Sequence, residues 1–389
     1  TAFINRINHL KKNVIQFDSK SWIPNPMWIS RLISKVSQYD LLSNTYCKSY
    51  PRYFLLPKTV PSFFIHQSSH CRSRERFPIL TYVYTTTENL SKVYLLRCSQ
   101  PVNITNKSKS DCEHEYLATV CGENGLSIID CRPKKNAFAY ELIGKGYEST
   151  SDFKKFIPNV SFHFLNIQHA YKTRDCYVSL MRKVFHGKNK PFKKWRKFVM
   201  HLLRKSSFVV SNLVGLSRSV LVHCSDGWDR TSQICSLTQI MVDPFYRTLN
   251  GFIELIQKDW IDMGHMFCSR CGHVQSENFD LTSPIFAQFI DAVAQLMNKY
   301  QNEFEFNLMF LKLILSSAYS QLFGDFMGNN YNERIEMPRP TSLFLCLDDQ
   351  NFGFADKIRN IQYIKSEKIL EIKKSDNYNF FSELMGTPA

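Results

Sequence analysis

The sequence predicts an α/β fold in which helices flank a central, twisted and largely parallel sheet. Short apolar runs that suit buried strands, such as 126–129 and 220–222, alternate with stretches of helical spacing, such as 111–120 and 231–241. The chain has 389 residues, of which 44% are hydrophobic, so it can bury a large core. Extra helices are expected toward the C-terminus, where apolar residues recur at helical spacing.

The N-terminal residues 1–45 combine apolar positions at helical spacing with the breakers Pro24 and Pro26. We expect this segment to be a lead-in that packs on one main domain, residues 46–389. Within that domain further strands are predicted at 79–84 and 160–167, and further helices are predicted from Thr173, from Ser283 with its capping hydroxyl, and over 304–323.

Composition limits the classes of protein to which the chain can belong. It has 49 Lys and Arg against 34 Asp and Glu, and this net charge of +15 favours attraction to an anionic membrane, a phosphorylated lipid or a nucleic acid. No run approaches the roughly 18 apolar residues of a transmembrane helix, and no secretory signal pattern is visible. The 12 cysteines are irregularly spaced, which favours reduced thiols in the cytoplasm. Because the chain starts at Thr1, we expect it to be part of a longer protein.

A short loop between the strand 220–222 and the helix that starts near Thr231 carries the candidate chemistry. It contains Cys224, and Arg230 follows six residues later, with Gly227 between them to let the backbone turn. A loop that leads into a helix N-terminus directs several backbone N–H groups at one point, which suits a phosphate dianion. Arg230 can add a planar, two-pronged donor to the same oxygens.

In such a loop Cys224 would lie under the bound phosphorus. The helix dipole, the loop amides and the arginine all favour its thiolate, which can attack phosphorus and form a cysteinyl-phosphate that water later hydrolyses. The leaving alkoxide needs a proton, and Asp229 or Asp226 could supply it. A cysteine and an arginine at this spacing also occur by chance, so the alternative is a buried structural cysteine.

The complete string His-Cys-Ser-Asp-Gly-Trp-Asp-Arg-Thr-Ser-Gln at 223–233 is more specific. It resembles the signature of the myotubularin-related phosphatases, within the cysteine-based phosphatase superfamily. The resemblance extends over about 45–345 and includes the order Arg-Ser-x-x-Arg-Phe-Pro at 72–78, Gly-Lys-Gly-Tyr-Glu at 144–148, Tyr-Arg-Thr at 246–248 and Lys-Asp-Trp at 258–260. The most similar subgroup is the active one with this signature.

This resemblance implies a phosphoinositide 3-phosphatase that removes the 3-phosphate of phosphatidylinositol 3-phosphate and of the 3,5-bisphosphate at endosomal membranes. It implies Cys224 as the nucleophile, Arg230 as the phosphate clamp and Asp229 as the general acid. The rest of the loop, formed by Ser225, Asp226, Gly227 and Trp228, would shape the pocket. Neither a metal nor another cofactor is required by this chemistry.

We expect the lipid headgroup to contact Asn136 and Arg270, which the resemblance retains, together with Lys145 and His169, which could compensate for departures from the family pattern; His169 itself stands where the family has an asparagine. The family has an asparagine where Tyr140 stands and a basic residue where Met266 stands, and these positions help to hold the inositol ring and its distal phosphate. Acceptance of a 5-phosphate is therefore open. Partners are expected to be the phosphoinositide at a membrane surface, to which the protein attaches peripherally, and a homo- or heterodimer with a myotubularin relative.

Two other functions remain as alternatives. The first is a non-catalytic or weakly active adaptor that pairs with an active relative, although adaptors of this kind usually lack the cysteine or the arginine that are present here. The second is a cysteine-based phosphatase that acts on a phosphoprotein or on an RNA 5′-phosphate, but no nucleic-acid module is recognisable. The spacing of His265, Cys268, Cys271 and His273 superficially resembles a zinc knuckle, but no second ligand pair follows, so no metal is expected.

The segment 182–205 has ten Lys or Arg and no acidic residue. One interpretation is an ordinary solvated helix face. The other is a patch that faces a membrane or a lipid headgroup, because Phe192, Trp195 and Phe198 are interleaved with the charges.

Overall fold

The computed structural model describes residues 27–36, 38–87, 90–102, 107–141, 146–148, 150–185, 192–274, 276, 279–337, 342–348, 355–381 and 384.

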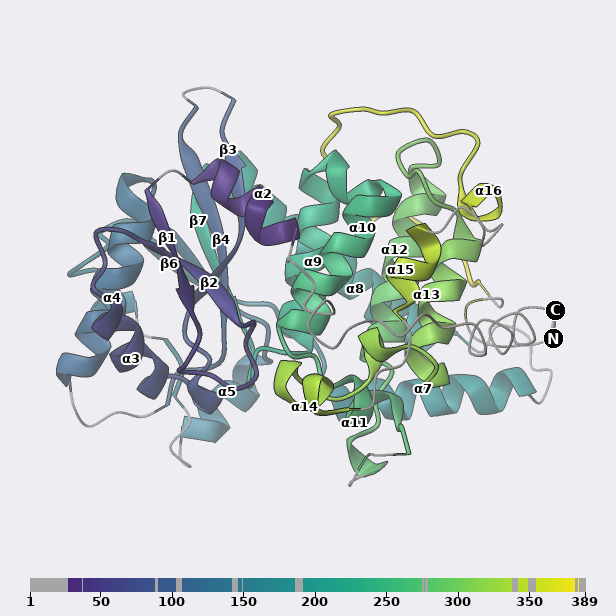
Figure 1. The fold of residues 1–389 in the computed structure, drawn as a ribbon, viewed down its shortest axis with the longest axis horizontal. Helices are drawn as coiled ribbons and strands as arrows, with labels where there is room; N and C mark the ends of the chain where they lie inside the picture. Colours follow the sequence, from purple (N-terminus) through teal and green to yellow (C-terminus); the bar gives the residue numbers. More distant parts are fainter. Residues whose placement is uncertain are drawn as a thin grey trace.

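A five-stranded sheet organises the N-terminal half of the chain (Figure 1). Its strand order is β3-β4-β7-β5-β6, in which β3 is antiparallel to β4 and all other neighbours are parallel. The predicted α/β class with a largely parallel sheet is therefore confirmed. The strands are β3 (Ile79–Thr85), β4 (Lys92–Cys98), β5 (Leu126–Asp130), β6 (Val160–Phe164) and β7 (Ser219–His223), and a separate antiparallel pair joins β1 (Tyr39–Ser43) to β2 (Tyr53–Pro57).

Both faces of the sheet are buried, as the continuous apolar strands require. Side chains alternate along β7, so Val220 and Val222 enter one core while Leu221 enters the other. On one side lie α3 (Ser62–His70), α4 (Lys107–Cys121), α5 (Lys134–Glu141) and α6 (Thr150–Phe153), and on the other α7 (Ala170–Phe185), α8 (Lys193–Val210) and α9 (Arg230–Val242). The central strand β7 therefore has helices packed on both of its faces.

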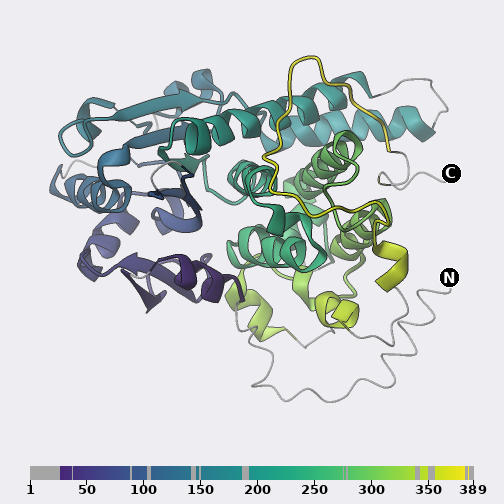
Figure 2. The same ribbon diagram turned by 90° about the horizontal axis from the view of Figure 1, so that it is seen from above.

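A helical half follows the sheet and shares the larger core, in which Phe252, Phe289, Phe306 and Phe310 stack or pack edge to face. Its helices are α10 (Leu249–Ile256), α11 (Phe267–Cys271), α12 (Ile285–Lys299), α13 (Leu308–Ser320), α14 (Tyr331–Glu336), α15 (Leu343–Asp348) and α16 (Ala355–Ile358). The extended C-terminal segment then crosses these helices, as Figure 2 shows in yellow. It is joined to α9 by a hydrogen bond from Leu370 N to Met241 O at 2.8 Å.

The described part of the predicted lead-in contains α2 (Met27–Lys35) and β1. Trp28 Nε1 donates to Asp262 Oδ2 at 2.8 Å, and Arg31 Nε donates to Glu254 Oε1 at 3.0 Å. Ile29 is buried with Trp28 against Leu80 of β3. This segment therefore packs on the rest of the chain, while the boundary at residue 45 stays a prediction.

One predicted helix cap and one predicted helix start are wrong. The hydroxyl of Ser283 does not cap α12 but donates to Ala170 O at 2.8 Å, which ties the start of α12 to the start of α7. The helix predicted from residue 304 begins only at Leu308, because the side chain of Asn307 accepts hydrogen bonds from the N–H groups of Met309 and Phe310 and so caps it.

The basic segment 182–205 covers the end of α7 and much of α8, and its aromatic residues do not face solvent together with the charges. Trp195 is fully buried and donates from Nε1 to Asp291 Oδ2 at 2.6 Å. Phe192 stacks on Phe380 of the C-terminal segment at 5.1 Å between ring centroids, and the partly buried Phe198 packs against the main core. The aromatic part of the predicted membrane patch is therefore wrong: on α8 these rings serve the core, and only the basic side chains are exposed.

Among the helices of the described ranges, none combines the length and the apolar character needed to cross a bilayer.

Candidate active site

The loop 224–229 lies at the carboxyl end of β7, between the ends of β4 and β5. In a parallel sheet this edge is where ligands bind, because the loops and helix N-termini converge there. Cys224 is buried, and its Sγ accepts a hydrogen bond from Gly227 N at 3.3 Å. Gly227 has φ of +78°, and a Cβ at this position would lie 2.5 Å from Cys98 O. Only glycine can therefore place its N–H on the cysteine sulfur here.

Two buried arginines hold this loop from below. The carbonyl oxygen of Gly227 accepts hydrogen bonds from Arg97 Nη2 at 2.8 Å and from Arg76 Nη2 at 3.2 Å. Arg97 also donates to Ser232 Oγ at 2.7 Å and to Asp259 Oδ1 at 2.8 Å, so it connects the loop to the first turn of α9 and to the helical half. These hydrogen bonds fix the peptide group of Gly227, whose N–H points at Cys224 Sγ.

Arg230 starts α9 and folds back over the same loop. Its Nη2 donates to Ser225 Oγ at 3.2 Å, and its Nη1 donates to Ile167 O at 3.5 Å. The guanidinium is almost fully buried. The sequence prediction that Cys224 and Arg230 belong to one compact loop therefore agrees with the geometry, in which Ser225 joins them.

Asp229 is not a free carboxyl. Arg270 donates to it from Nε at 3.2 Å to both oxygens and from Nη2 at 2.8 Å to Oδ2, and His265 Nδ1 lies 3.2 Å from Oδ1. Burial alone would raise the pKa of Asp229, but the Arg270 charge and the His265 hydrogen bond outweigh it and hold this pKa well below its usual range. In this structure Asp229 is therefore a carboxylate.

Asp226 and Trp228 lie on the outer side of the loop. Asp226 Oδ1 accepts a hydrogen bond from Ser73 Oγ at 3.3 Å and lies 3.8 Å from Arg74 Nε, while its side chain stays partly open to solvent. The ring of Trp228 lies 5.7 Å from the Arg76 guanidinium, and its carbonyl oxygen lies 2.9 Å from His265 Nδ1. Trp228 thus supports the loop from the side.

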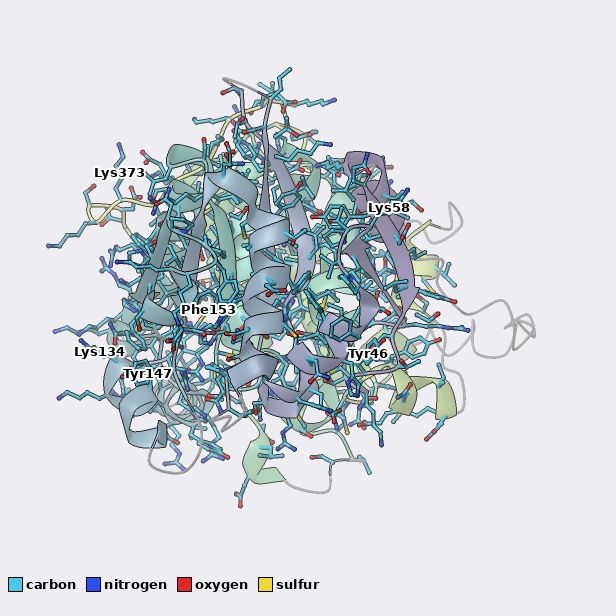
Figure 3. All side chains as sticks on the ribbon, turned by 90° about the vertical axis from the view of Figure 1, so that its left-hand side faces the viewer. Tyr46, Lys58, Lys134, Tyr147, Phe153 and Lys373 are labelled. Atoms are coloured by element: carbon cyan, nitrogen blue, oxygen red, sulfur yellow. The ribbon has the colours of Figure 1, made fainter. Side chains whose placement is uncertain are left out.

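The four predicted headgroup residues fall in different places. Arg270 contacts the loop through its ion pair with Asp229. His169 lies close enough for the loop charges to act on it, because burial, and then the Arg230 guanidinium, lower the pKa of His169. Asn136 lies in α5, just beyond β5, outside the described hydrogen-bond network around Cys224. Lys145 lies outside the described residues. Figure 3 places Lys134 and Tyr147, which flank this region in the chain, at the lower end of the molecule.

The glycine loop that ends at Glu148 is held by hydrogen bonds close to the loop 224–229. Arg72 Nη1 donates to Glu148 Oε1 at 2.6 Å, and Gly146 N donates to Pro101 O at 3.1 Å. Arg132 Nη2 also donates to Gly146 O at 3.2 Å. Arg72 is fully buried, and its guanidinium forms ion pairs with two buried carboxylates, those of Glu113 and Glu148.

The residues that resembled a zinc knuckle have other contacts. His265 faces Asp229, and His273 Nε2 lies 2.8 Å from Ala318 O. Within the described ranges, no three His, Cys, Asp or Glu side chains gather in a way that could hold a metal ion.

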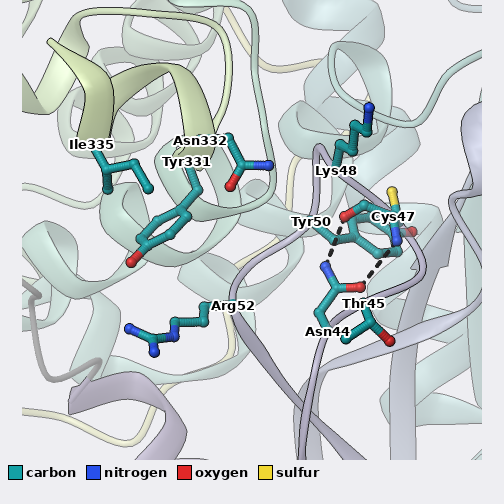
Figure 4. A pocket seen from close by; sticks show the side chains of 9 residues that line it. All are labelled: Asn44, Thr45, Cys47, Lys48, Tyr50, Arg52, Tyr331, Asn332 and Ile335. Carbon is teal, nitrogen blue, oxygen red and sulfur yellow. Dashed lines mark hydrogen bonds between the residues drawn. The ribbon is translucent and has the colours of Figure 1, made fainter.

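A hollow of about 430 Å³ lies apart from the catalytic loop, between residues 44–52 and α14 (Figure 4). Asn44 braces one side of it, because its Nδ2 donates to Cys47 O at 2.7 Å and its Oδ1 accepts from Cys47 N at 3.0 Å. Tyr331 and Ile335 line the other side. None of the loop residues 224–230 lines this hollow, so it is distinct from the candidate active site.

The sequence did not predict that Arg97 and His265 support the loop 224–229. An arginine inside a predicted buried strand was the available signal for Arg97, because such a charge needs a buried partner. His265 offered no comparable signal, since its partner Asp229 is far away in the chain.

Comparison with known proteins agrees with this geometry. A family model described as the myotubularin-like phosphatase domain matches residues 17–335. The chain is 35% identical over 328 residues to phosphatidylinositol-3,5-bisphosphate 3-phosphatase MTMR6 of Mus musculus, which covers 81% of this chain and 50% of that protein. It is 35% identical over 327 residues to phosphatidylinositol-3,5-bisphosphate 3-phosphatase MTMR8 of Homo sapiens, which covers 81% of this chain and 44% of that protein.

A third relative is phosphatidylinositol-3-phosphate phosphatase MTMR7 of Homo sapiens, 35% identical over 305 residues, which cover 75% of this chain and 44% of that protein. The chain thus spans about half the length of the curated relatives it matches. A solved structure of Tk-PTP in a mutant form matches with a TM-score of 0.28 and 13% identity over 53% of this chain and 91% of that chain, a likeness too weak to bear on fold or function. The extent of the family match and the identity to these relatives establish that the chain belongs to the myotubularin-like phosphatase family.

Proposed function

We propose that this chain is the phosphatase domain, residues 46–389 with the lead-in 1–45, of a phosphoinositide 3-phosphatase. Its substrate is phosphatidylinositol 3-phosphate, on the cytoplasmic surface of endosomal membranes to which the protein attaches peripherally. The observation that carries this proposal is the placement of Cys224 Sγ 3.3 Å from Gly227 N, in one loop with the buried Arg230. The names of the relatives, which are phosphatases of 3-phosphorylated phosphoinositides, support the choice of lipid.

The chemistry has two displacement steps. Cys224 Sγ attacks the 3-phosphate, so that an S–P bond forms while the bond from phosphorus to the inositol oxygen breaks. Arg230 and the loop N–H groups stabilise the charge on the phosphoryl oxygens, and the leaving alkoxide takes a proton from Asp229. Water then attacks the cysteinyl-phosphate, which releases inorganic phosphate and regenerates the thiolate. No step needs a metal or another cofactor.

Asp229 must carry a proton when the alkoxide leaves, although Arg270 and His265 hold it as a carboxylate in this structure. A bound phosphate dianion adds negative charge beside Asp229 and competes for Arg270, and both effects raise the pKa of a neighbouring carboxyl. Substrate binding therefore prepares the acid. The same competition gives Arg270 a contact with the headgroup, together with His169, Asn136 and Lys145.

A non-catalytic or weakly active adaptor is the second candidate, and the ion pair between Asp229 and Arg270 favours it, because an acid that stays ionised cannot protonate the leaving group. An adaptor of this kind would pair with a myotubularin relative, and homodimers or heterodimers are the expected partners. The two candidates differ in turnover and can share lipid binding.

The test is phosphate release from short-chain phosphatidylinositol 3-phosphate, the 3,5-bisphosphate, and the 4- and 5-monophosphates, with the parent chain and with Cys224→Ser. Release from the 3-phosphorylated lipids alone, lost in Cys224→Ser while lipid binding persists, supports the phosphatase. Binding without release from any lipid supports the adaptor. The ratio of the two 3-phosphorylated substrates measures how far the 5-phosphate is accepted where Met266 replaces the family's basic residue.

Asp229→Ala separates the role of the acid from that of the nucleophile. An alkoxide leaving group needs protonation, whereas the phenolate of an activated aryl phosphate does not. The variant should therefore slow lipid hydrolysis much more than hydrolysis of the aryl phosphate. An equal loss on both substrates would rule out Asp229 as the general acid.

A further inference from the structure

The helix α7 presents to solvent a face that mixes basic and apolar side chains. Along it, exposed positions recur at helical spacing, at 171–172, 175, 178–179 and 182–183, while residues 173, 174, 176, 177, 180 and 181 are buried or partly buried. Tyr171 is 45% exposed and Val178 is 40% exposed. The inner face of α7 packs on the core through Cys176 and Leu180, so the outer face is free of the fold's own packing.

A shallow hollow of about 540 Å³ follows this outer face. Three cations line it, Arg174, Arg182 and Lys183, with Val178 between them. The single acidic residue of the helix, Asp175, lies 3.7 Å from Arg174 Nε and offsets part of one cation. The hollow therefore keeps a positive balance, which suits phosphate groups, around an apolar side chain, which suits the lipid region below them.

The position of α7 connects this face to the catalytic loop. The helix begins one residue after His169, whose pKa responds to the charge of Arg230. Arg174 Nη1 donates to Asp280 O at 2.6 Å, and Arg270 Nη1 donates to Leu281 O at 2.7 Å, so the start of α7 and the partner of Asp229 hold the same short turn.

Figure 1 shows α5, α11 and α7 in the lower half of the molecule. The helix α7 then extends for 16 residues, or about 24 Å. A flat surface that contacted α7 along this length would also reach the start of the helix, next to His169 and Asp280.

We propose that the outer face of α7 docks on an anionic lipid bilayer and holds the catalytic loop against the membrane that contains the substrate. The proposal rests on the proposed function in that the substrate is a membrane lipid. The basic side chains contact lipid phosphates while their aliphatic stems, with Val178 and Tyr171, enter the interfacial region. An acidic protein would match the charges but has no need of exposed apolar side chains along the same stripe.

The experiment compares two variants of the full 389-residue chain with a charge-matched control. Arg182→Glu/Lys183→Glu reverses the charge at the far end of the hollow, and Val178→Asp removes its apolar centre. The control, Lys58→Glu/Lys373→Glu, changes the net charge equally at exposed positions in the upper half of the molecule in Figure 3. Each is measured for co-sedimentation with vesicles of phosphatidylcholine containing phosphatidylserine, for release from phosphatidylinositol 3-phosphate in those vesicles, and for release from the soluble short-chain lipid.

We expect the double reversal to weaken vesicle binding by about tenfold or more, since each basic residue near an anionic surface contributes roughly a fivefold factor. Val178→Asp should also weaken it, and added salt should weaken binding by the parent. Release from vesicles should fall in parallel, while release from the short-chain lipid stays at the parent's rate and thereby shows that the variants are folded. The control should behave as the parent does.

Equal vesicle binding by the parent and both variants would overturn the proposal. It would also be overturned if the parent bound anionic vesicles no better than pure phosphatidylcholine vesicles, a result that would point to an acidic protein as the partner. Co-sedimentation is repeated in the Cys224→Ser background, where binding does not depend on turnover. Failure of the proposed function would then appear as no phosphate release with intact, α7-dependent binding, which is distinct from failure of the docking proposal.

Discussion

Arg270 and Asp229 lie 41 residues apart in the chain and form a two-pronged ion pair inside the candidate active site. Nε of Arg270 lies 3.2 Å from each carboxylate oxygen, and Nη2 lies 2.8 Å from Oδ2. The pair joins the catalytic loop to α11, so the same contact sets the charge of the proposed acid and the position of a proposed headgroup residue.

Arg270→Met should destabilise the chain at neutral pH by about 3 kcal/mol, because it leaves a buried carboxylate without its main counter-charge. The lowered pKa of Asp229 contributes stability above the pKa of an unfolded aspartate, near 4, and this contribution is lost as the pH falls through the lowered folded pKa. The deficit of the variant should therefore be largest at neutral pH and shrink in acid. Urea unfolding across this pH range measures it.

The control for that measurement is Arg196→Met, which removes a guanidinium from the exposed face of α8. It should leave both the free energy of unfolding and its pH dependence close to those of the parent. A deficit of Arg270→Met that stayed constant from neutral to acid pH would show that the ion pair is not its cause.

Gly227→Ala should abolish most activity. The backbone there has φ of +78°, and the added Cβ would meet Cys98 O at 2.5 Å, so the loop must shift away from Cys224. We expect a loss of stability of roughly 2 kcal/mol or more and a much larger relative loss of phosphate release. Gly215→Ala is the matched control, because nothing lies within 4 Å of a Cβ there, and it should be close to neutral. Retained activity in Gly227→Ala would mean that the bond from Gly227 N to the sulfur is dispensable.

Arg97→Lys tests whether the hydrogen bonds from Arg97 hold the loop 224–229 in place. A lysine keeps the charge beside Asp259 but cannot donate to Gly227 O, Ser232 Oγ and Asp259 at once. Two buried acceptors lose a donor, so stability should fall by about 1–3 kcal/mol. Because the loop amides are aimed at the transition state, kcat on the short-chain lipid should fall more than KM changes. Arg52→Lys, at an exposed position, is the control, and a change confined to KM would contradict this role.

Asp291 lies in the core of the helical half, and burial raises its pKa to about 6, although Tyr378, Gln295 and Trp195 donate hydrogen bonds to it. A raised folded pKa means that this group favours folding below the unfolded pKa, near 4, and that this contribution is lost as the pH rises through 6. The free energy of unfolding of Asp291→Asn, relative to that of the parent, should therefore increase by roughly 3 kcal/mol as the pH rises from about 4 to about 7.

Urea unfolding of Asp291→Asn and of the parent at these two pH values gives the difference in their free energies of unfolding at each pH. Subtracting one difference from the other removes any cost of the amide that does not depend on pH. Asp356→Asn alters an exposed carboxyl on α16 and should show no such change. If the stability of Asp291→Asn relative to the parent were independent of pH, Asp291 would not titrate in this range.

Several predictions from the sequence depended on neighbours in the chain, and these agree with the structure. The strand, loop and helix around Cys224 are predictable because the apolar run 220–222, Gly227 and the helical spacing after Arg230 each act over a few residues. The order of strands and helices predicted a mostly parallel sheet for the same reason, since parallel neighbours need crossover helices. Cys224 and Arg230, to which the sequence assigns the proposed chemistry, likewise lie in one loop.

Predictions from local sequence patterns were wrong where a side chain bonds to a partner far away in the sequence. Ser283 has the sequence context of a helix cap, yet its hydroxyl bonds to Ala170. Trp195 lies in a run of basic residues that favoured a membrane patch, but a buried carboxylate 96 residues away accepts its N–H. Along α8 the buried residues Trp195, Val199, Leu202 and Val209 recur at helical spacing, so Trp195 belongs to the core-facing side of that helix and not to its charged side.

The sequence by itself determined the family, the α/β sheet and the cysteine loop, because those depend on short-range backbone preferences and on one contiguous string of residues. Only the tertiary structure decided that Arg97 and Arg76 hold Gly227, and that Arg270 and His265 keep Asp229 ionised. The physical reason is that a buried charge or an unpaired carbonyl must find its partner wherever the fold brings one. That partner is set by the packing of the layers and not by its distance along the chain.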